Sequence, residues 1–67
     1  MRPENILVKH LRDERGLTLQ EMHAETGIHP SVISRIENGA RITGDNAIRL
    51  AQWSGRPVAD FFNVGNN

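Results

Sequence analysis

Apolar residues recur at helical spacing along this chain, and turn-forming residues divide them into short segments. In the first segment, Leu7 and Leu11 lie one helical turn apart and so share a face. Pro3 precedes them and Gly16 follows them. Because proline suits the first turn of a helix and glycine commonly ends one, the pattern predicts a first helix over residues 3–15.

The stretch LTLQEM, which begins at Leu17, carries two independent marks of a helix start. Thr18 and Glu21 have the spacing of a capping box, in which each side chain bonds the backbone of the other residue. Leu17 and Met22 have the spacing of a hydrophobic staple across the same cap. We therefore predict a second helix that begins at this cap and ends at Thr26, where a glycine follows.

A third helix is expected to begin at Pro30, because proline fits the first helical position and disfavours helical geometry in the residue before it. Gly39 then ends this helix after about Asn38. Only residues 27–29 join the second and third helices. So short a connection makes the two helix axes cross steeply.

Two more helices are expected after residue 42. The fourth begins at a cap on Thr43 or Gly44 and ends before Gly55. The fifth is short and begins at Pro57. No strand-like alternation of useful length occurs, so we predict an all-α fold of five helices in a single domain over residues 1–67.

The length and composition of the chain exclude several classes of protein. The 67 residues make one domain at most, whose core buries only about 60% of the surface of the unfolded chain. There is no cysteine, so neither a disulfide nor a thiolate metal site holds the fold together. No apolar run approaches the roughly 20 residues that cross a bilayer, so we expect a cytoplasmic protein without a membrane partner. The tail, residues 63–67, has no pattern and is expected to fray.

Basic and acidic side chains balance at eight of each, which argues against a strongly electropositive binder of nucleic acid. Their distribution is nevertheless uneven. Residues 1–27 hold four basic and five acidic side chains. Residues 28–56 hold the basic Arg35, Arg41, Arg49 and Arg56 against the acidic Glu37 and Asp45. The basic excess therefore lies in and after the predicted third helix.

The third helix is expected to have one buried face and one presenting face. At about 100° per residue, three apolar side chains fall within one arc: Val32, Ile33 and Ile36. The opposite arc holds Ser31, Ser34, Arg35 and Asn38. A solvated face more often carries Lys and Glu, whereas Ser, Asn and Arg are types that reach base edges and phosphates. This chemistry favours contact with nucleic acid, although polar surface helices are common.

A capped helix, a short turn and a second helix with a polar face have the order of a helix-turn-helix, whose second helix enters the major groove of DNA. The segments LRDERGLTLQEM and TGIHPSVISRIENG resemble the helix-turn-helix family of phage Cro proteins and lambda-like repressors. The resemblance covers about residues 6–62. It implies a five-helix, lambda-repressor-like DNA-binding domain with its helix-turn-helix at about residues 18–38.

The resemblance also implies roles for individual residues. Four of them stand where family members contact bases: Pro30, Ser31, Ser34 and Arg35. Asn38, with the loop that carries Arg41, stands where the family holds phosphate. Thr18 and Leu19 stand where the second helix meets the DNA backbone, although members often have Gln in place of Leu19.

Three further expectations concern the ends of helices. Arg12 and Glu37 match a pair that in the family forms an internal ion pair between the first helix and the end of the third. Thr43, at the start of the fourth helix, is expected to bind phosphate together with that helix N-terminus. His29 either caps the third helix or contacts a phosphate.

Metal binding and catalysis find little support in the residues. No two of His10, His23 and His29 have the i, i+4 spacing of metal ligands on one helix, and no cysteine completes a set. His23 takes a place that in the family usually holds a small residue. Ser31 and Ser34 would need a positioned base and a pocket to act as nucleophiles. We therefore predict no metal, no cofactor and no enzymatic activity.

The apolar side chains near the C-terminus have two interpretations. They are either core residues of a small domain or the contact between two copies of the chain: Trp53, Val58, Phe61 and Phe62. We expect a homodimer, at least on DNA, because a two-fold dimer reads two half-sites about one helical turn apart.

The sequence as a whole predicts a sequence-specific transcriptional regulator that binds double-stranded DNA of the nucleoid. We expect it to be a stand-alone, Cro-like repressor of a phage or mobile element, and its operator to be an inverted repeat. No small-molecule effector is evident. One alternative is an antitoxin whose C-terminal aromatic surface binds a toxin. Another is a protein-interaction module that has lost DNA binding, which the zero net charge and Leu19 would favour.

Overall fold

The computed structural model describes residues 2–62 of the chain, and all regular structure in that range is helical. Four α-helices and one short 3-10 helix follow one another: α1 at Pro3–Glu14, α2 at Leu19–Thr26, α3 at Pro30–Glu37, α4 at Gly44–Ser54 and η1 at Val58–Asp60. The prediction of an all-α fold is confirmed.

The helices begin where the sequence predicts. Pro3 and Pro30 are the first residues of α1 and α3, and Thr18 and Thr43 are the N-caps of α2 and α4. Two helices end one residue earlier than predicted, because Arg15 and Asn38 serve as C-caps rather than as helical residues. Each of these caps is followed by a glycine with positive φ, which turns the chain out of the helix.

The predicted fifth helix is only a single 3-10 turn. The Phe61 amide bonds to the Val58 carbonyl at 3.0 Å, which is the i to i+3 pattern of a 3-10 turn. The chain then places Phe61 in the core with 1% of its surface exposed. One turn is enough to bury this ring, and a helix this short gains too few hydrogen bonds to offset nucleation. The tail predicted to fray, residues 63–67, lies outside the described residues.

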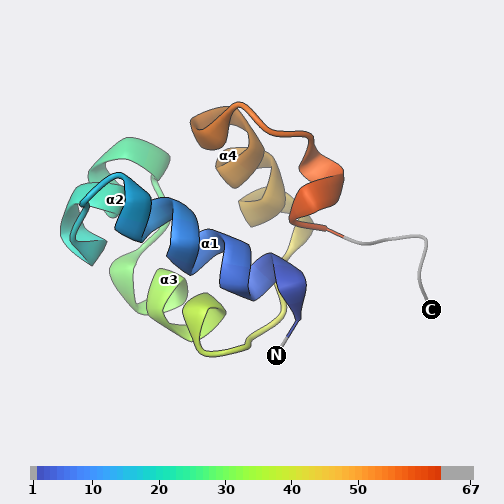
Figure 1. The fold of residues 1–67 in the computed structure, drawn as a ribbon, viewed down its shortest axis with the longest axis horizontal. Helices are drawn as coiled ribbons and strands as arrows, with labels where there is room; N and C mark the ends of the chain where they lie inside the picture. The colour runs from blue at the N-terminus through green and yellow to red at the C-terminus, as the bar shows by residue number, and fades with distance from the viewer. Residues whose placement is uncertain (1, 63–67) are drawn as a thin grey trace.

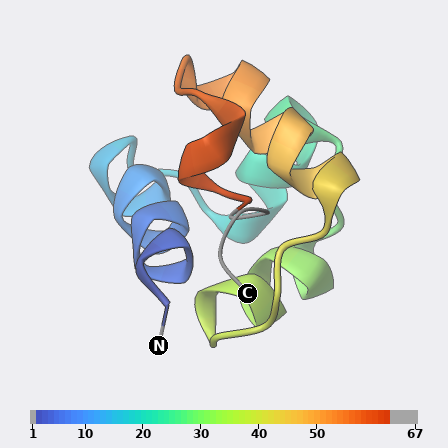
Figure 2. The same cartoon turned by 90° about the vertical axis from the view of Figure 1, so that its right-hand side faces the viewer.

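The helices lie around one core (Figure 1). α1 packs on α3, and α2 packs on both α3 and α4. Figure 2 shows α3 and the loop after it at one end of the molecule, and the connection from α4 to η1 at the opposite end. In both views the N-terminus of α1 lies beside the loop that follows α3.

Ten apolar side chains form the core, and none is more than 4% exposed: Val8, Leu11, Met22, Ile28, Ile33, Ile36, Ile42, Ala47, Leu50 and Phe61. Burial of each large aliphatic side chain stabilises the fold by about 1.5–3 kcal/mol. Three of these residues, Ile28, Ile33 and Ile36, come from the turn before α3 and from α3 itself. The orientation of α3 is therefore set by the core and not by the turn alone.

Candidate nucleic-acid interface

The start of α2 is held by the predicted capping box. The Thr18 hydroxyl accepts a hydrogen bond from the Glu21 amide at 3.1 Å, and the Thr18 amide donates to the Glu21 carboxylate at 2.8 Å. The pKa of Glu21 is lowered chiefly because the hydrogen bond from the Thr18 backbone amide favours the charged carboxylate. Thr18 is exposed, so its backbone and hydroxyl lie at the surface at the N-terminal end of α2.

The turn between α2 and α3 is fixed by its own hydrogen bonds. Gly27 has φ of 79°, and its amide bonds to the His23 carbonyl at 2.8 Å. The buried Thr26 hydroxyl donates to the Met22 carbonyl at 2.8 Å and accepts from the Ile28 amide at 3.1 Å. These bonds satisfy backbone groups that a helix end leaves free, and they hold the short connection in one conformation.

His29 caps α3, one of the two roles expected for it. Its Nδ1 accepts a hydrogen bond from the Ser31 amide at 3.1 Å, and the same atom lies 2.8 Å from the Ser31 hydroxyl. The capping bond requires an unprotonated Nδ1, so the proton of the neutral ring lies on Nε2. The half-buried ring of His23 lies 5.8 Å from that of His29, which shows that the turn accommodates His23 where the family usually has a small residue.

The polar face predicted for α3 is at the surface. Ser31, Arg35 and Asn38 are exposed, and Ser34 is half-buried. The Asn38 side chain donates to the Ser34 carbonyl at 2.7 Å, which leaves its oxygen and its second amide hydrogen for an outside partner.

The opposite face of α3 is buried through Ile33 and Ile36, at 1% and 2% exposed. Val32, predicted to be buried with them, is half-buried, as is Pro30 at the first position of the helix. A helix anchored along one side in this way holds the polar side chains of its other side in fixed relative positions.

The loop after α3 presents the two other predicted phosphate ligands. Arg41 and Thr43 are exposed, and Ile42 between them is buried at 2%. The Thr43 side chain makes no capping bond to α4, so its hydroxyl remains available. Asp45 lies in the first turn of α4, and its carboxylate disfavours a phosphate at this helix N-terminus.

Arg12 and Glu37 form the predicted ion pair. The Arg12 guanidinium donates to the two carboxylate oxygens of Glu37 at 2.6 and 2.8 Å, and to the Leu17 carbonyl at 2.9 Å. The side chains are only 16% and 8% exposed. The pKa of Arg12 is raised because the hydrogen bonds to Glu37 favour the charged guanidinium. One side chain of α1 thus joins the end of α3 to the residue before the α2 cap.

Asn5 is a contact residue that the sequence analysis did not identify. Its side-chain amide donates to the carbonyls of Ile36 at 2.8 Å and Ala40 at 2.7 Å, and it is 0% exposed. Its position in the sequence could have indicated this role, because Asn5 lies on the same face of α1 as the buried Val8 and Leu11. A polar side chain on an apolar helix face needs hydrogen-bond partners in the interior.

The balance of charges looks different once the ion pairs are known. Three acidic residues pair with lysine or arginine, namely Asp13, Glu37 and Asp60, and Glu14 lies 3.7 Å from the His10 ring. Glu21 binds the α2 cap, and Glu25 accepts a hydrogen bond from the indole of Trp53. Within residues 2–62, no ion pair involves Arg35, Arg41 or Arg49. The zero net charge therefore conceals unpaired arginines on α3 and on the loop after it.

The C-terminal apolar residues are used largely within the chain. Phe61 is 1% exposed and has no surface to offer a second copy. The Trp53 indole donates to Glu25 at 2.8 Å, and the Arg15 guanidinium lies 4.2 Å from the centre of its ring. Of the four predicted dimer contacts, Val58 is the most accessible, at 42% exposed, and Phe62 and Trp53 are half-buried.

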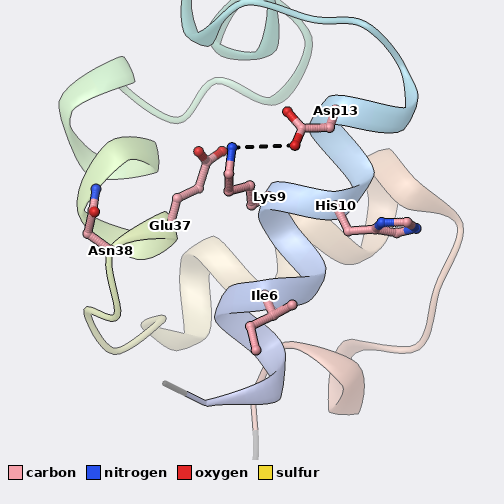
Figure 3. A pocket seen from close by; sticks show the side chains of 6 residues that line it. All are labelled: Ile6, Lys9, His10, Asp13, Glu37 and Asn38. Atoms are coloured by element: carbon pink, nitrogen blue, oxygen red, sulfur yellow. Dashed lines mark ion pairs between the residues drawn. The ribbon is translucent and has the colours of Figure 1, made fainter.

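A groove runs between α1 and the end of α3 (Figure 3), lined by Ile6, Lys9, His10, Asp13, Glu37 and Asn38. The Lys9 ammonium and the Asp13 carboxylate pair along α1 at 3.4 Å. Across the residues that the structure describes, no group of three His, Cys, Asp or Glu side chains is placed to hold a metal ion. None of the described helices has the length and hydropathy of a membrane span.

Comparison with known proteins identifies the family. Residues 8–52 match a family model described as helix-turn-helix. Searches of curated proteins and of solved structures found no match. The matched residues run from the middle of α1 to the last turns of α4 and include the capped α2, the Gly27 turn and the polar face of α3. The chain therefore belongs to the lambda-repressor-like helix-turn-helix family, and it carries the DNA-binding domain of a regulator.

Proposed function

We propose that this protein is a sequence-specific transcriptional regulator, a Cro-like repressor that places α3 in the major groove of an operator. The observation that carries the proposal is the exposed polar face of α3, with Arg35 free of ion pairs in the described residues. An arginine in the groove can donate to guanine O6 and N7 together. Ser31 and Ser34 are the secondary base contacts.

The residues around α3 are suited to hold the DNA backbone. Asn38 lies at the C-terminal end of α3, and Arg41 and Thr43 lie in the loop after it. Within residues 2–62, none of the three donates a hydrogen bond to an acidic side chain. Thr18 presents a backbone and hydroxyl at the start of α2. Contacts of this kind fix the orientation of a protein on DNA, whereas base contacts confer specificity.

Selection from a randomised DNA library tests this function. The protein would be incubated with the library at near-physiological salt, and bound sequences would be enriched over successive rounds. We expect an enriched inverted repeat. The control is Arg35→Ala, which should lose enrichment at one base pair of each half-site. Absence of binding even at low salt, where phosphate contacts are strongest, would overturn the proposal.

We also propose that the operator is bound by two copies of the chain. Helix-turn-helix dimers place their recognition helices about 34 Å apart, one turn of DNA. Val58 on η1 and Ile48 on α4 are 42% and 50% exposed, so both are available to contact a second copy. Val58→Asp should weaken cooperative binding to the full operator while leaving single half-site affinity unchanged. Ile6→Asp on α1 is the contrasting variant, because it places a carboxylate in the groove that Asn38 also lines, and it should weaken binding to the half-site and to the full operator alike.

The antitoxin hypothesis uses the same C-terminal end. Trp53 and Phe61 are engaged within the chain, so a toxin would have to bind mainly through Val58 and Phe62. Co-expression with the product of a neighbouring reading frame would test it, with Val58→Asp as the variant that disrupts the complex. The zero net charge is a weak argument for the interaction-module hypothesis, because Arg35 and Arg41 make no ion pair within the described residues.

A further inference from the structure

Asn5 makes hydrogen bonds to two parts of the chain that are remote from it in sequence. Its Nδ2 donates to the Ile36 carbonyl, in the last turn of α3, and to the Ala40 carbonyl, in the loop that follows. These partners are 31 and 35 residues away. One buried amide in α1 therefore joins the end of the recognition helix to the loop that presents Arg41.

The other end of the amide shows which property of Asn5 matters. Its Oδ1 is buried and has no hydrogen-bond partner among the described residues. A buried acceptor without a partner costs free energy, so the contribution of Asn5 comes from its two donors. Both hydrogens of its amide group are donated to backbone carbonyl oxygens, one in α3 and one in the loop after it.

Arg41 is held on both sides by buried groups. Before it in the chain, the Ala40 carbonyl is bonded to Asn5, and after it Ile42 is 2% exposed in the core. Arg41 itself is exposed and has no ion pair within residues 2–62. The Ala40 amide also donates to the Arg35 carbonyl at 2.9 Å. The reach of Arg41 toward a phosphate is thus determined by anchors in the backbone on either side rather than by contacts of its own guanidinium.

We propose that Asn5 is a positioning residue for the phosphate-binding loop. It sets the place of Arg41 relative to α3, so that Arg41 contacts the DNA backbone while Arg35 contacts a base. The proposal rests on the DNA-binding function proposed above. Asn5 does not touch DNA in this proposal, and its effect passes through the Ala40 carbonyl.

Two variants in α1 separate positioning from stability. Asn5→Ala removes both donors to the loop and to α3. Val8→Ala, one turn further along the same face, removes buried apolar surface and leaves both hydrogen bonds in place. Asn5→Ser keeps one donor and provides a folded variant if Asn5→Ala does not fold. Thermal melts followed by circular dichroism would establish the temperature at which each variant is folded.

The first measurement uses the protein without DNA. Amide hydrogen exchange and nitrogen-15 relaxation would be recorded for Ala40 and Arg41 and for the amides of α3 as an internal reference. We expect Asn5→Ala to speed exchange and raise mobility selectively at Ala40 and Arg41, and Asn5→Ser to show a smaller change. Val8→Ala should change no loop amide selectively. Loop amides as well ordered in Asn5→Ala as in the unmodified protein would overturn the proposal.

The second measurement uses DNA. For the selected operator, the slope of log affinity against log salt should fall by about one for each bound copy in Asn5→Ala, as in Arg41→Ala, because each copy loses one phosphate contact. The double variant should lose no more affinity than Arg41→Ala alone, since both changes remove the same contact. An unchanged slope, or losses that add, would overturn the positioning role. Failure of the unmodified protein to bind any DNA would instead overturn the proposed function, and the loop amides would still show whether Asn5 orders the loop.

Discussion

The two ends of the molecule use their arginines differently. At the end formed by α3 and the loop after it, Arg35 and Arg41 are exposed and make no ion pair within the described residues. At the opposite end, Arg15 lies against the Trp53 ring at 4.2 Å and Arg56 bonds to Asp60 at 3.3 Å. Although the chain has equal numbers of basic and acidic residues, the arginines at the α3 end have no ion-pair partner among the described residues, whereas Arg15 and Arg56 at the other end contact Trp53 and Asp60.

Local pairing explains why net charge is a poor guide here. A paired arginine has already lost much of its ability to attract phosphate, whereas a free one keeps it. Within residues 2–62, Glu4 and Asp45 have no partner in an ion pair, a cap or a bond to Trp53, and Glu14 has only the His10 ring. The neutral sum is thus compatible with a basic surface at one end.

Of the variants considered, one that removes the carboxylate partner of Arg12 should have the largest effect on stability. Glu37→Gln leaves a largely buried guanidinium without its carboxylate, and we expect the free energy of unfolding to fall by about 3 kcal/mol. Urea denaturation would measure the change. Lys9→Ala is the control, because it removes an exposed ion pair on the same helix and should cost at most about 1 kcal/mol. Equal losses in the two variants would contradict the structural role of the pair.

Removing the free arginines should change DNA binding and leave stability nearly unchanged. Arg35→Ala should cost about 1–3 kcal/mol on the operator and little on random DNA, because a base contact is lost. Arg41→Ala should weaken binding to all sequences alike. Arg56→Ala removes the same charge at the opposite end and should change neither. Titrations on both DNAs would show the pattern, and equal losses on the two for Arg35→Ala would refute a base contact.

Disrupting the satisfied end should affect stability alone. Trp53→Phe removes the hydrogen bond to Glu25 and keeps an aromatic ring beside Arg15, so we expect a loss of about 1 kcal/mol in the free energy of unfolding. Operator affinity should stay the same. Circular dichroism would follow unfolding, since the variant has no tryptophan fluorescence. A loss of affinity larger than the loss of stability would show that Trp53 belongs to the interface.

The smallest expected effect is the pH dependence of the α2 cap. The pKa of Glu21 is lower in the folded chain than in the unfolded one, because Thr18 donates to its carboxylate. Its contribution is therefore complete above the unfolded pKa and is lost as the pH falls through the folded pKa. Glu21→Gln should flatten the decline of melting temperature in acid. Identical acid profiles for Glu21→Gln and the unmodified protein would contradict this assignment.

The local features of the site were predictable from the sequence. Pro30 and the Thr18–Glu21 pair located two helix starts, because caps act between residues that are three or fewer positions apart. The polar face of α3 followed from spacing within a single helix. The expected fifth helix is a single 3-10 turn after Pro57, so the count of five α-helices is not confirmed; one such turn is enough to bury Phe61. Helix propensity depends on local sequence and does not predict that burial of Phe61 in the core leaves only one turn here.

The sequence by itself determined where the helices begin and which side of α3 is polar, because these depend on neighbours along the chain. The tertiary structure decided which arginines are free, that Trp53 is engaged with Arg15 and Glu25, and that Asn5 bonds the loop beside Arg41. Those facts depend on residues brought together from distant positions. No spacing rule encodes such contacts, because they arise only when the packing of the core has fixed how the helices lie against one another.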